Sequence, residues 1–259
     1  MIWFYWGNPH MTFLRYMTLW SACAFNQDVA LVTPKDPRAR RGNWAEAPEF
    51  DLGENYMERL GDLPLRRYSL EDIFPGLARL QAPEVQTSDL LAWLILWQYG
   101  GTVADMDIVF TKPVPKVEHD INFVAFDGHP KPGYTPVSFL QGKPCGQWRE
   151  VLRDAMRAYE PEQYESCGAA HLERLFRGAE AFHRLPSRIV FPWAEGEVPW
   201  AEWGRMTFRE LHPLPPETIG IHWYAGSIEG QMYNRVISPS WLRDFPDRTI
   251  SRAIRESFQ

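Results

Sequence analysis

Cysteine is scarce in this chain, with three residues among 259, and no two of them are close in sequence. Cys23, Cys145 and Cys167 form no C-x-x-C pair, so their spacing excludes both a disulfide framework and a clustered zinc site. We expect three buried, reduced thiols.

Positive charge is also in short supply. The net charge is −6, the pI is about 5.7, and the densest basic run is the short segment RARR at 38 to 41. Proteins that follow a nucleic-acid backbone need a larger basic surface. No nucleic-acid partner is therefore expected.

Long apolar segments and targeting signals are missing as well. The longest apolar run, LLAWLILW at 90 to 97, is too short to cross a bilayer. The first ten residues lack the basic flank and the cleavage site of a signal peptide. We expect no transmembrane segment and a cytoplasmic location, and peripheral contact with a membrane surface remains open.

The chain is rich in apolar residues. Hydrophobic residues make up 45% of it and charged residues 23%, which are the proportions of a soluble globular protein. Its length lies within the range of one α/β domain. We therefore expect a single domain over residues 1–259.

Strand-like and helix-like segments alternate along the sequence. IWFYW at 2 to 6 and DVALVTP at 28 to 34 are strand-forming runs, and residues 11 to 25 between them have helical spacing. Residues 84 to 99 predict a helix that is buried on nearly every side and is ended by two glycines. We also expect strands near 102–110, 121–126, 136–140 and 187–191, helices near 146–160 and 168–178, and an irregular loop over 34–50. The pattern predicts an α/β fold with a mixed, mostly parallel central sheet flanked by helices.

Two aspartates interrupt the apolar segment TVADMDIVF at 102 to 110. On a strand, Asp105 and Asp107 point to the same side, and neighbouring carboxylates stay ionised at low cost only with a cation between them. Oxygen ligands suit Mg²⁺ or Mn²⁺, which keep positions open for phosphate oxygens. Taken alone, the two aspartates would also fit a strand that ends early. In that case both carboxylates would be solvated, or one of them would cap a turn.

The residues around this pair resemble a known family. SDLLAWLILWQYGGTVADMDIVF at 88 to 110 is similar to the signature of the DXD-motif glycosyltransferases of family thirty-two, which are related to fungal mannosyltransferases, bacterial polysaccharide transferases and clostridial glucosylating toxins. FYWG at 4 to 7 and HWYAGS at 222 to 227 are two shorter matches in the same order. The resemblance implies a GT-A-like (Rossmann-like) fold, a UDP- or GDP-sugar as donor, and transfer with retention to a carbohydrate, lipid-linked or protein acceptor.

The resemblance also implies roles for individual residues. Asp105 and Asp107 would be the catalytic pair that holds Mn²⁺ or Mg²⁺ on the donor diphosphate. His222 would close over the diphosphate, and its imidazole suits an open position on the metal. Donor binding would involve Trp6, Ser88, Asp89, Gly100, Gly101 and Ser227, with Trp6 against the base and Asp89 at the sugar.

Three residues depart from the family pattern. Ala92 stands where Arg is usual, Val103 where Tyr is common, and Ile228 where Trp often follows Gly-Ser. Three of the assigned roles also have a structural alternative. Asp89 would be a helix-dipole partner, Trp6 a core residue, and His222 a hydrogen-bonded structural histidine. The segment 191–204 contains three tryptophans, Trp193, Trp200 and Trp203. We expect them to pack within their own loop, and the alternative is that they form a platform for the acceptor.

These observations together predict a metal-dependent, retaining hexosyltransferase. One rival is a non-catalytic homologue that binds a nucleotide-sugar or a glycan, and Ala92 favours it. Another is a metal-dependent nucleotidyltransferase. That class carries a basic, glycine-rich phosphate loop near the amino terminus, and WGNPHMT at 6 to 12 is not one.

Overall fold

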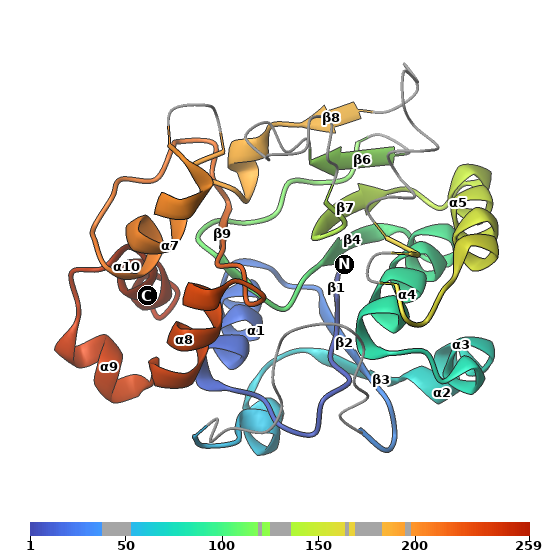
Figure 1. Ribbon diagram of the computed structural model, residues 1–259, viewed down its shortest axis with the longest axis horizontal. Coiled ribbons are helices and arrows are strands. Elements are labelled where there is room, and N and C mark those ends of the chain that lie inside the picture. The colour runs from blue at the N-terminus through green and yellow to red at the C-terminus, as the bar shows by residue number, and fades with distance from the viewer. Residues whose placement is uncertain (38–52, 119–120, 125–135, 164–165, 169–182, 195–197) are drawn as a thin grey trace.

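The computed structural model describes residues 1–259 except 38–52, 119–120, 125–135, 164–165, 169–182 and 195–197, and Figure 1 shows how its elements are arranged. The described strands are β1 (Ile2–Tyr5), β2 (Val29–Thr33), β3 (Arg66–Ser69), β4 (Gly101–Ala104), β5 (Ile108–Phe110), β6 (Ile121–Val124), β7 (Phe139–Gly142), β8 (His183–Leu185) and β9 (Gly220–His222). The described α-helices are α1 (Phe13–Phe25), α2 (Leu70–Ile73), α3 (Pro75–Leu80), α4 (Glu84–Gln98), α5 (Gly146–Ala158), α7 (Trp200–Phe208), α8 (Ile228–Val236), α9 (Pro239–Asp244) and α10 (Thr249–Glu256). Two 3₁₀ helices, η1 (Tyr56–Asp62) and η2 (Ser187–Ile189), complete the set.

The main sheet has seven described strands in the order β3-β2-β1-β4-β7-β6-β8. The pairings β1–β2, β1–β4, β2–β3 and β6–β8 are parallel, and β7 is antiparallel to both β4 and β6. Strands β5 and β9 form a separate antiparallel pair. The predicted α/β fold with a mixed, mostly parallel sheet flanked by helices is confirmed.

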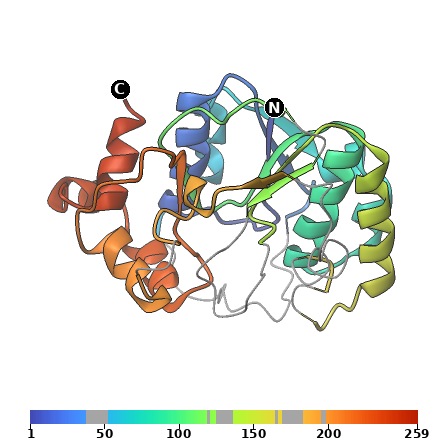
Figure 2. The same ribbon diagram turned by 90° about the horizontal axis from the view of Figure 1, so that it is seen from above.

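Both faces of the central strands are buried, which explains why their sequences are apolar throughout. Successive side chains of a strand point to opposite faces. In β1, Ile2 and Phe4 join the core on the α1 side, whereas Trp3 joins the core on the α4 side. Figures 1 and 2 show α4 and α5 on one side of the sheet and α1 with the carboxyl-terminal helices on the other.

The two helices predicted in the first hundred residues begin and end where local signals place them. In α1, the Thr12 side chain accepts a hydrogen bond from the Arg15 N–H and caps the first turn. The end of α4 is formed by Gly100, whose φ of 65° lies in the left-handed region and whose N–H donates to the Ile95 carbonyl. Helix α4 is packed on nearly all sides, as expected.

Two expected strands are wrong. The strand over 102–110 ends at Ala104 and resumes at Ile108, because β5 leaves the main sheet to pair with β9. The segment 187–191 forms the 3₁₀ helix η2, since Pro186 precedes it and the Phe191 N–H donates back to the Ser187 carbonyl. Its β-branched residues are buried by tertiary contacts and not by a strand ladder.

Several expectations concern residues that the structure leaves undescribed. The helix expected over 168–178 falls almost entirely outside the described residues, as do most of the loop over 34–50 and the end of the strand over 121–126. None of the described helices combines the length and the apolar character that crossing a membrane requires.

Candidate metal centre

The turn between β4 and β5 carries the two aspartates. The Asp105 N–H still donates to the Ser138 carbonyl, so the pairing of β4 with the β7 segment continues by one residue. Met106 and Asp107 then form a turn, and β5 departs toward β9. The register of the β5–β9 pair sets Ile108 opposite His222, which brings the histidine to the aspartates.

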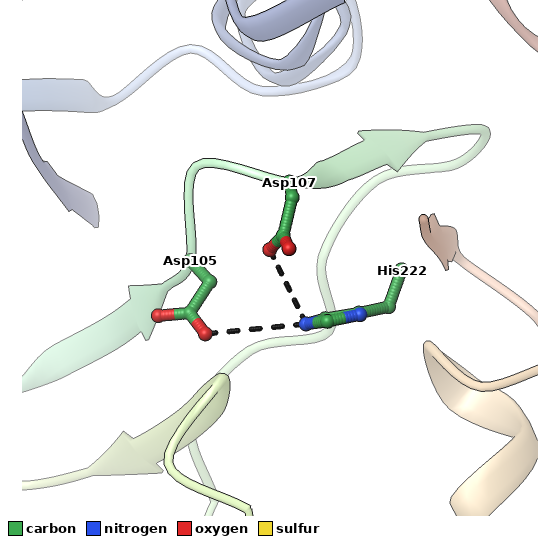
Figure 3. Close-up of side chains that lie close together, drawn as sticks. All are labelled: Asp105, Asp107 and His222. Atoms are coloured by element: carbon green, nitrogen blue, oxygen red, sulfur yellow. Dashed lines mark ion pairs between the residues drawn. The ribbon is translucent and has the colours of Figure 1, made fainter. Parts of the chain in front are cut away.

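Figure 3 shows both carboxylates directed at one ring nitrogen of His222. The His222 Nε2 atom lies 3.2 Å from Asp107 Oδ1 and 3.9 Å from Asp105 Oδ2. One ligand atom of each of the three residues lies within 4.8 Å of those of the other two. The sequence pair and a residue more than a hundred positions downstream thus form one group.

Backbone amides of the segment after β9 hold two members of this group in place. The Ala225 N–H donates to Asp107 Oδ2 at 2.9 Å, and the Trp223 backbone N–H donates to the Asp107 carbonyl at 2.9 Å. The Tyr224 N–H donates to His222 Nδ1 at 3.3 Å, which orients the ring so that Nε2 faces the two aspartates. Tyr224 has a φ of 51°, a left-handed conformation that costs a non-glycine residue about 1–3 kcal/mol.

The two aspartates differ in their surroundings. Asp107 is buried, whereas 41% of the Asp105 side chain remains exposed. Burial raises the pKa of Asp105, hydrogen bonding to His222 opposes this, and the charge of Asp107 adds to the rise. Because solvent reaches Asp105, we expect a smaller rise in its pKa than full enclosure would cause.

The group suits a small divalent cation. Ligand atoms about 2.1 Å from an octahedral ion lie roughly 3 Å apart when adjacent and roughly 4.2 Å apart when opposite. The two distances from His222 Nε2 to the carboxylates, 3.2 Å and 3.9 Å, fall within this range. Asp107 Oδ1 is enclosed and forms no hydrogen bond within the described part of the chain; its neighbour is His222 Nε2 at 3.2 Å, so a cation between the two would take this oxygen as a ligand. Two carboxylates and an imidazole form a ligand set that suits a divalent cation.

The predicted donor residues of the first strand and of α4 have packed surroundings of their own. Trp6 follows β1 and is buried in the core on the α1 side, with its backbone N–H donating to the Val32 carbonyl. Ser88 is half-buried on α4, and the Asp89 carboxylate lies directly against the backbone of Gly168. Their contacts with a donor stay predictions.

Gly100, Gly101 and Ser227 each have a structural role. Gly101 begins β4, about 13 Å along the strand from Asp105, so it lies at the opposite end from the trio. A Cβ atom on Gly100 or Gly101 would meet backbone of Gly142 or Met1 respectively. Ser227 caps α8, where its side chain accepts from the Gly230 N–H. A donor role for these residues likewise stays a prediction.

The three departures from the family pattern occupy different environments. Ala92 is buried on α4 among core residues, so an arginine at this position would require repacking. Val103 is half-buried on β4, and Ile228 begins α8 with 88% of its surface exposed. Trp193 and Trp203 lie in the core, consistent with a self-packed loop, and the Trp200 side chain lies outside what the structure describes.

One residue near the site escaped the sequence analysis. Arg15 is buried on α1, with its guanidinium against the rings of Trp6 and Trp223. A signal was present in the sequence, because Arg15 is the only charged residue in the whole of α1. A single arginine in an otherwise uncharged, apolar helix is a candidate for burial with partners.

No protein-family model matches this sequence. No curated protein matches it either. Among solved structures, the glycosyltransferase GlyE of Streptococcus pneumoniae TIGR4 is similar over 99% of this chain, with 12% identity and a TM-score of 0.50. The apo form of GlyE aligns over 99% of this chain with 12% identity and a TM-score of 0.51.

The alignments with GlyE cover 63% and 62% of the GlyE chains, so this chain spans less than two thirds of their length. The PaToxG glycosyltransferase aligns over 68% of this chain and 69% of its own, with 14% identity and a TM-score of 0.48. At these identities the likeness concerns the fold. This chain has a GT-A-like α/β fold of the kind found in the glycosyltransferase GlyE.

Proposed function

We propose that this chain is a metal-dependent, retaining glycosyltransferase that moves a sugar from a nucleoside-diphosphate sugar to a carbohydrate, lipid-linked or protein acceptor. The observation that carries the proposal is the group of Asp105, Asp107 and His222 beside the end of a central strand. Crevices at the carboxyl ends of strands are the usual ligand sites of α/β sheets. The fold shared with GlyE supports the same class of reaction.

The three side chains would hold Mn²⁺ or Mg²⁺ on the donor diphosphate. A bound divalent cation stabilises the negative charge that develops on a departing diphosphate. Asp107 needs no reorganisation for this task, since the Ala225 N–H already fixes its carboxylate. The Tyr224 N–H fixes the ring plane of His222 in the same way.

Transfer with retention needs no protein nucleophile in this proposal. The acceptor oxygen bonds to the anomeric carbon on the face from which the diphosphate leaves, and the acceptor proton passes to an oxygen of that diphosphate. The chain's own residues then contribute by orienting the donor and by limiting access of water.

The direct test is a screen of UDP- and GDP-sugars for hydrolysis by the wild-type protein with Mn²⁺, because transferases of this kind often hydrolyse donors slowly without an acceptor. We expect at least one donor to be hydrolysed, and excess chelator to abolish that hydrolysis. Turnover that persists in chelator would contradict metal dependence. A donor that binds in the presence of Mn²⁺ and is never hydrolysed or transferred would favour the non-catalytic homologue.

Acidification should weaken Mn²⁺ binding, because protons and the cation compete for Asp105, whose pKa is raised. In the metal-free protein, the raised pKa of Asp105 should have the opposite effect on stability: it favours the fold at low pH, and that contribution is lost as pH rises through the raised value. The increase in Tm caused by Mn²⁺ should therefore grow between about pH 5 and pH 8. Asp105→Asn should bind Mn²⁺ more weakly and with a shallower pH dependence. An unchanged dependence in that variant would exclude Asp105 as a ligand.

A further inference from the structure

A buried cation connects three parts of the chain next to the metal centre. Arg15, in the first turn of α1, is only 6% exposed. Its guanidinium carbon lies 5.1 Å from the centroid of the Trp6 ring and 4.9 Å from that of Trp223. Trp6 follows β1, and Trp223 directly follows His222 at the end of β9. The arginine therefore lies between indoles from opposite ends of the sequence.

This arrangement suits arginine in particular. Burying a positive charge is costly unless nearby groups stabilise it. Two indole faces provide cation–π attraction, and the planar guanidinium can lie along aromatic rings, whereas a lysine ammonium acts as a compact point charge.

The start of α1 is also tied to α8. The Thr12 hydroxyl donates to Asn234 on α8 at 2.5 Å, and α8 is the helix that Ser227 caps. The Trp223 backbone N–H donates to the Asp107 carbonyl. Movement of the Trp223 residue would therefore displace the backbone that holds both Asp107 and His222.

We propose that Arg15 is a positioning residue of the donor site, fixing Trp6 and Trp223 relative to Asp105, Asp107 and His222 and thereby setting the affinity for a nucleoside diphosphate. This inference rests on the proposed function, because it assumes that the trio binds the diphosphate through a cation. Arg15 acts through the two indoles. It forms no bond in the transfer itself.

The test compares Arg15→Met and Arg15→Lys with matched variants of Arg149. The Arg149 guanidinium lies 5.6 Å from the Trp97 ring on the exposed side of α5, so it has the same type of contact at another place. For each full-length variant, we would measure the Tm, the Kd for Mn²⁺ alone, and the Kd for UDP and GDP at saturating Mn²⁺. Fluorine NMR of fluorotryptophan-labelled protein would follow the Trp6 and Trp223 signals.

We expect Arg15→Met to weaken nucleoside-diphosphate binding on the order of tenfold or more and to weaken Mn²⁺ binding less. Arg15→Lys should recover part of the affinity, since the charge returns without the planar stacking. The Trp6 and Trp223 signals should shift in both Arg15 variants. Arg149→Met and Arg149→Lys should bind the nucleotides as the wild type does.

The outcomes separate this inference from the function on which it rests. Folded Arg15 variants that bind UDP and GDP as tightly as wild type would overturn the positioning role and leave the proposed function standing. Wild-type protein that binds neither nucleotide in the presence of Mn²⁺ would overturn both. If Arg15→Met does not fold, Arg15→Lys provides the test. A lowered Tm of Arg15→Lys with unchanged nucleotide affinity would show that Arg15 contributes to stability alone.

Discussion

Asp107→Asn should abolish donor turnover and weaken Mn²⁺ binding on the order of 100-fold or more, since loss of a direct ligand should cost at least as much as loss of an outer-shell partner. The fold should survive, because asparagine has the same shape and its amide oxygen can still accept from the Ala225 N–H. The metal-free variant should be as stable as metal-free wild type, because the substitution removes a buried carboxylate charge. Isothermal titration with Mn²⁺, donor hydrolysis and thermal unfolding measure the three effects.

Asp28→Asn is the matched control for this variant. Asp28 directly precedes β2 at the amino end of the parallel strands, and it forms an exposed ion pair with Arg66 at 2.8 Å. Exposed ion pairs contribute little to stability. The control should therefore keep Mn²⁺ affinity and turnover. Wild-type metal binding and turnover in Asp107→Asn would remove the basis for a catalytic cation at this site.

Gly101→Ala should destabilise the fold by roughly 3–5 kcal/mol. Gly101 has a φ of 104°, and a Cβ atom there would lie 2.5 Å from the Met1 carbonyl oxygen and 3.4 Å from Trp3 Nε1. The Met1 carbonyl accepts from the Thr102 N–H, so the substitution forces β1 and β4 apart where they first pair. Denaturant unfolding measures the loss.

Gly146→Ala provides the comparison. Gly146 begins α5, and a Cβ atom added there would meet no neighbouring side chain within 4 Å, so alanine should be neutral or slightly stabilising. Measured well below its Tm, the Gly101 variant also tests the donor role that the family resemblance implies: Mn²⁺ and nucleotide affinities equal to those of wild type would assign this glycine to the fold alone. A stable Gly101→Ala protein with weakened nucleotide binding would instead assign this glycine to the donor.

Local patterns predicted the elements whose environment is uniform along their length. The helix α4 is apolar on nearly every side because it packs against both the sheet and α5. Its carboxyl end could be predicted because Gly100 adopts the left-handed conformation that ends a helix. Strands β1 and β2 are apolar almost throughout because both faces of the sheet are covered. For these elements, burial can be predicted from the residue types alone.

The break between β4 and β5 could not be predicted in the same way. The alternation in TVADMDIVF fits a continuous strand, and the partner that draws β5 out of the main sheet lies more than a hundred residues downstream. A local pattern has no information about which strand will pair with which. The buried position of Arg15 depends in the same way on Trp6 and Trp223, which come from distant segments.

The sequence by itself determined the α/β class, the main helices and the presence of two carboxylates in an apolar setting, because these follow from residue type and period. Only the tertiary structure decided how the site is assembled. The carboxylates meet through a turn and not along one strand, and the register that sets Ile108 opposite His222 supplies the third ligand atom. Chemistry at a site depends on distances of a few ångströms between segments far apart in the chain, and those distances are fixed by strand pairing and packing.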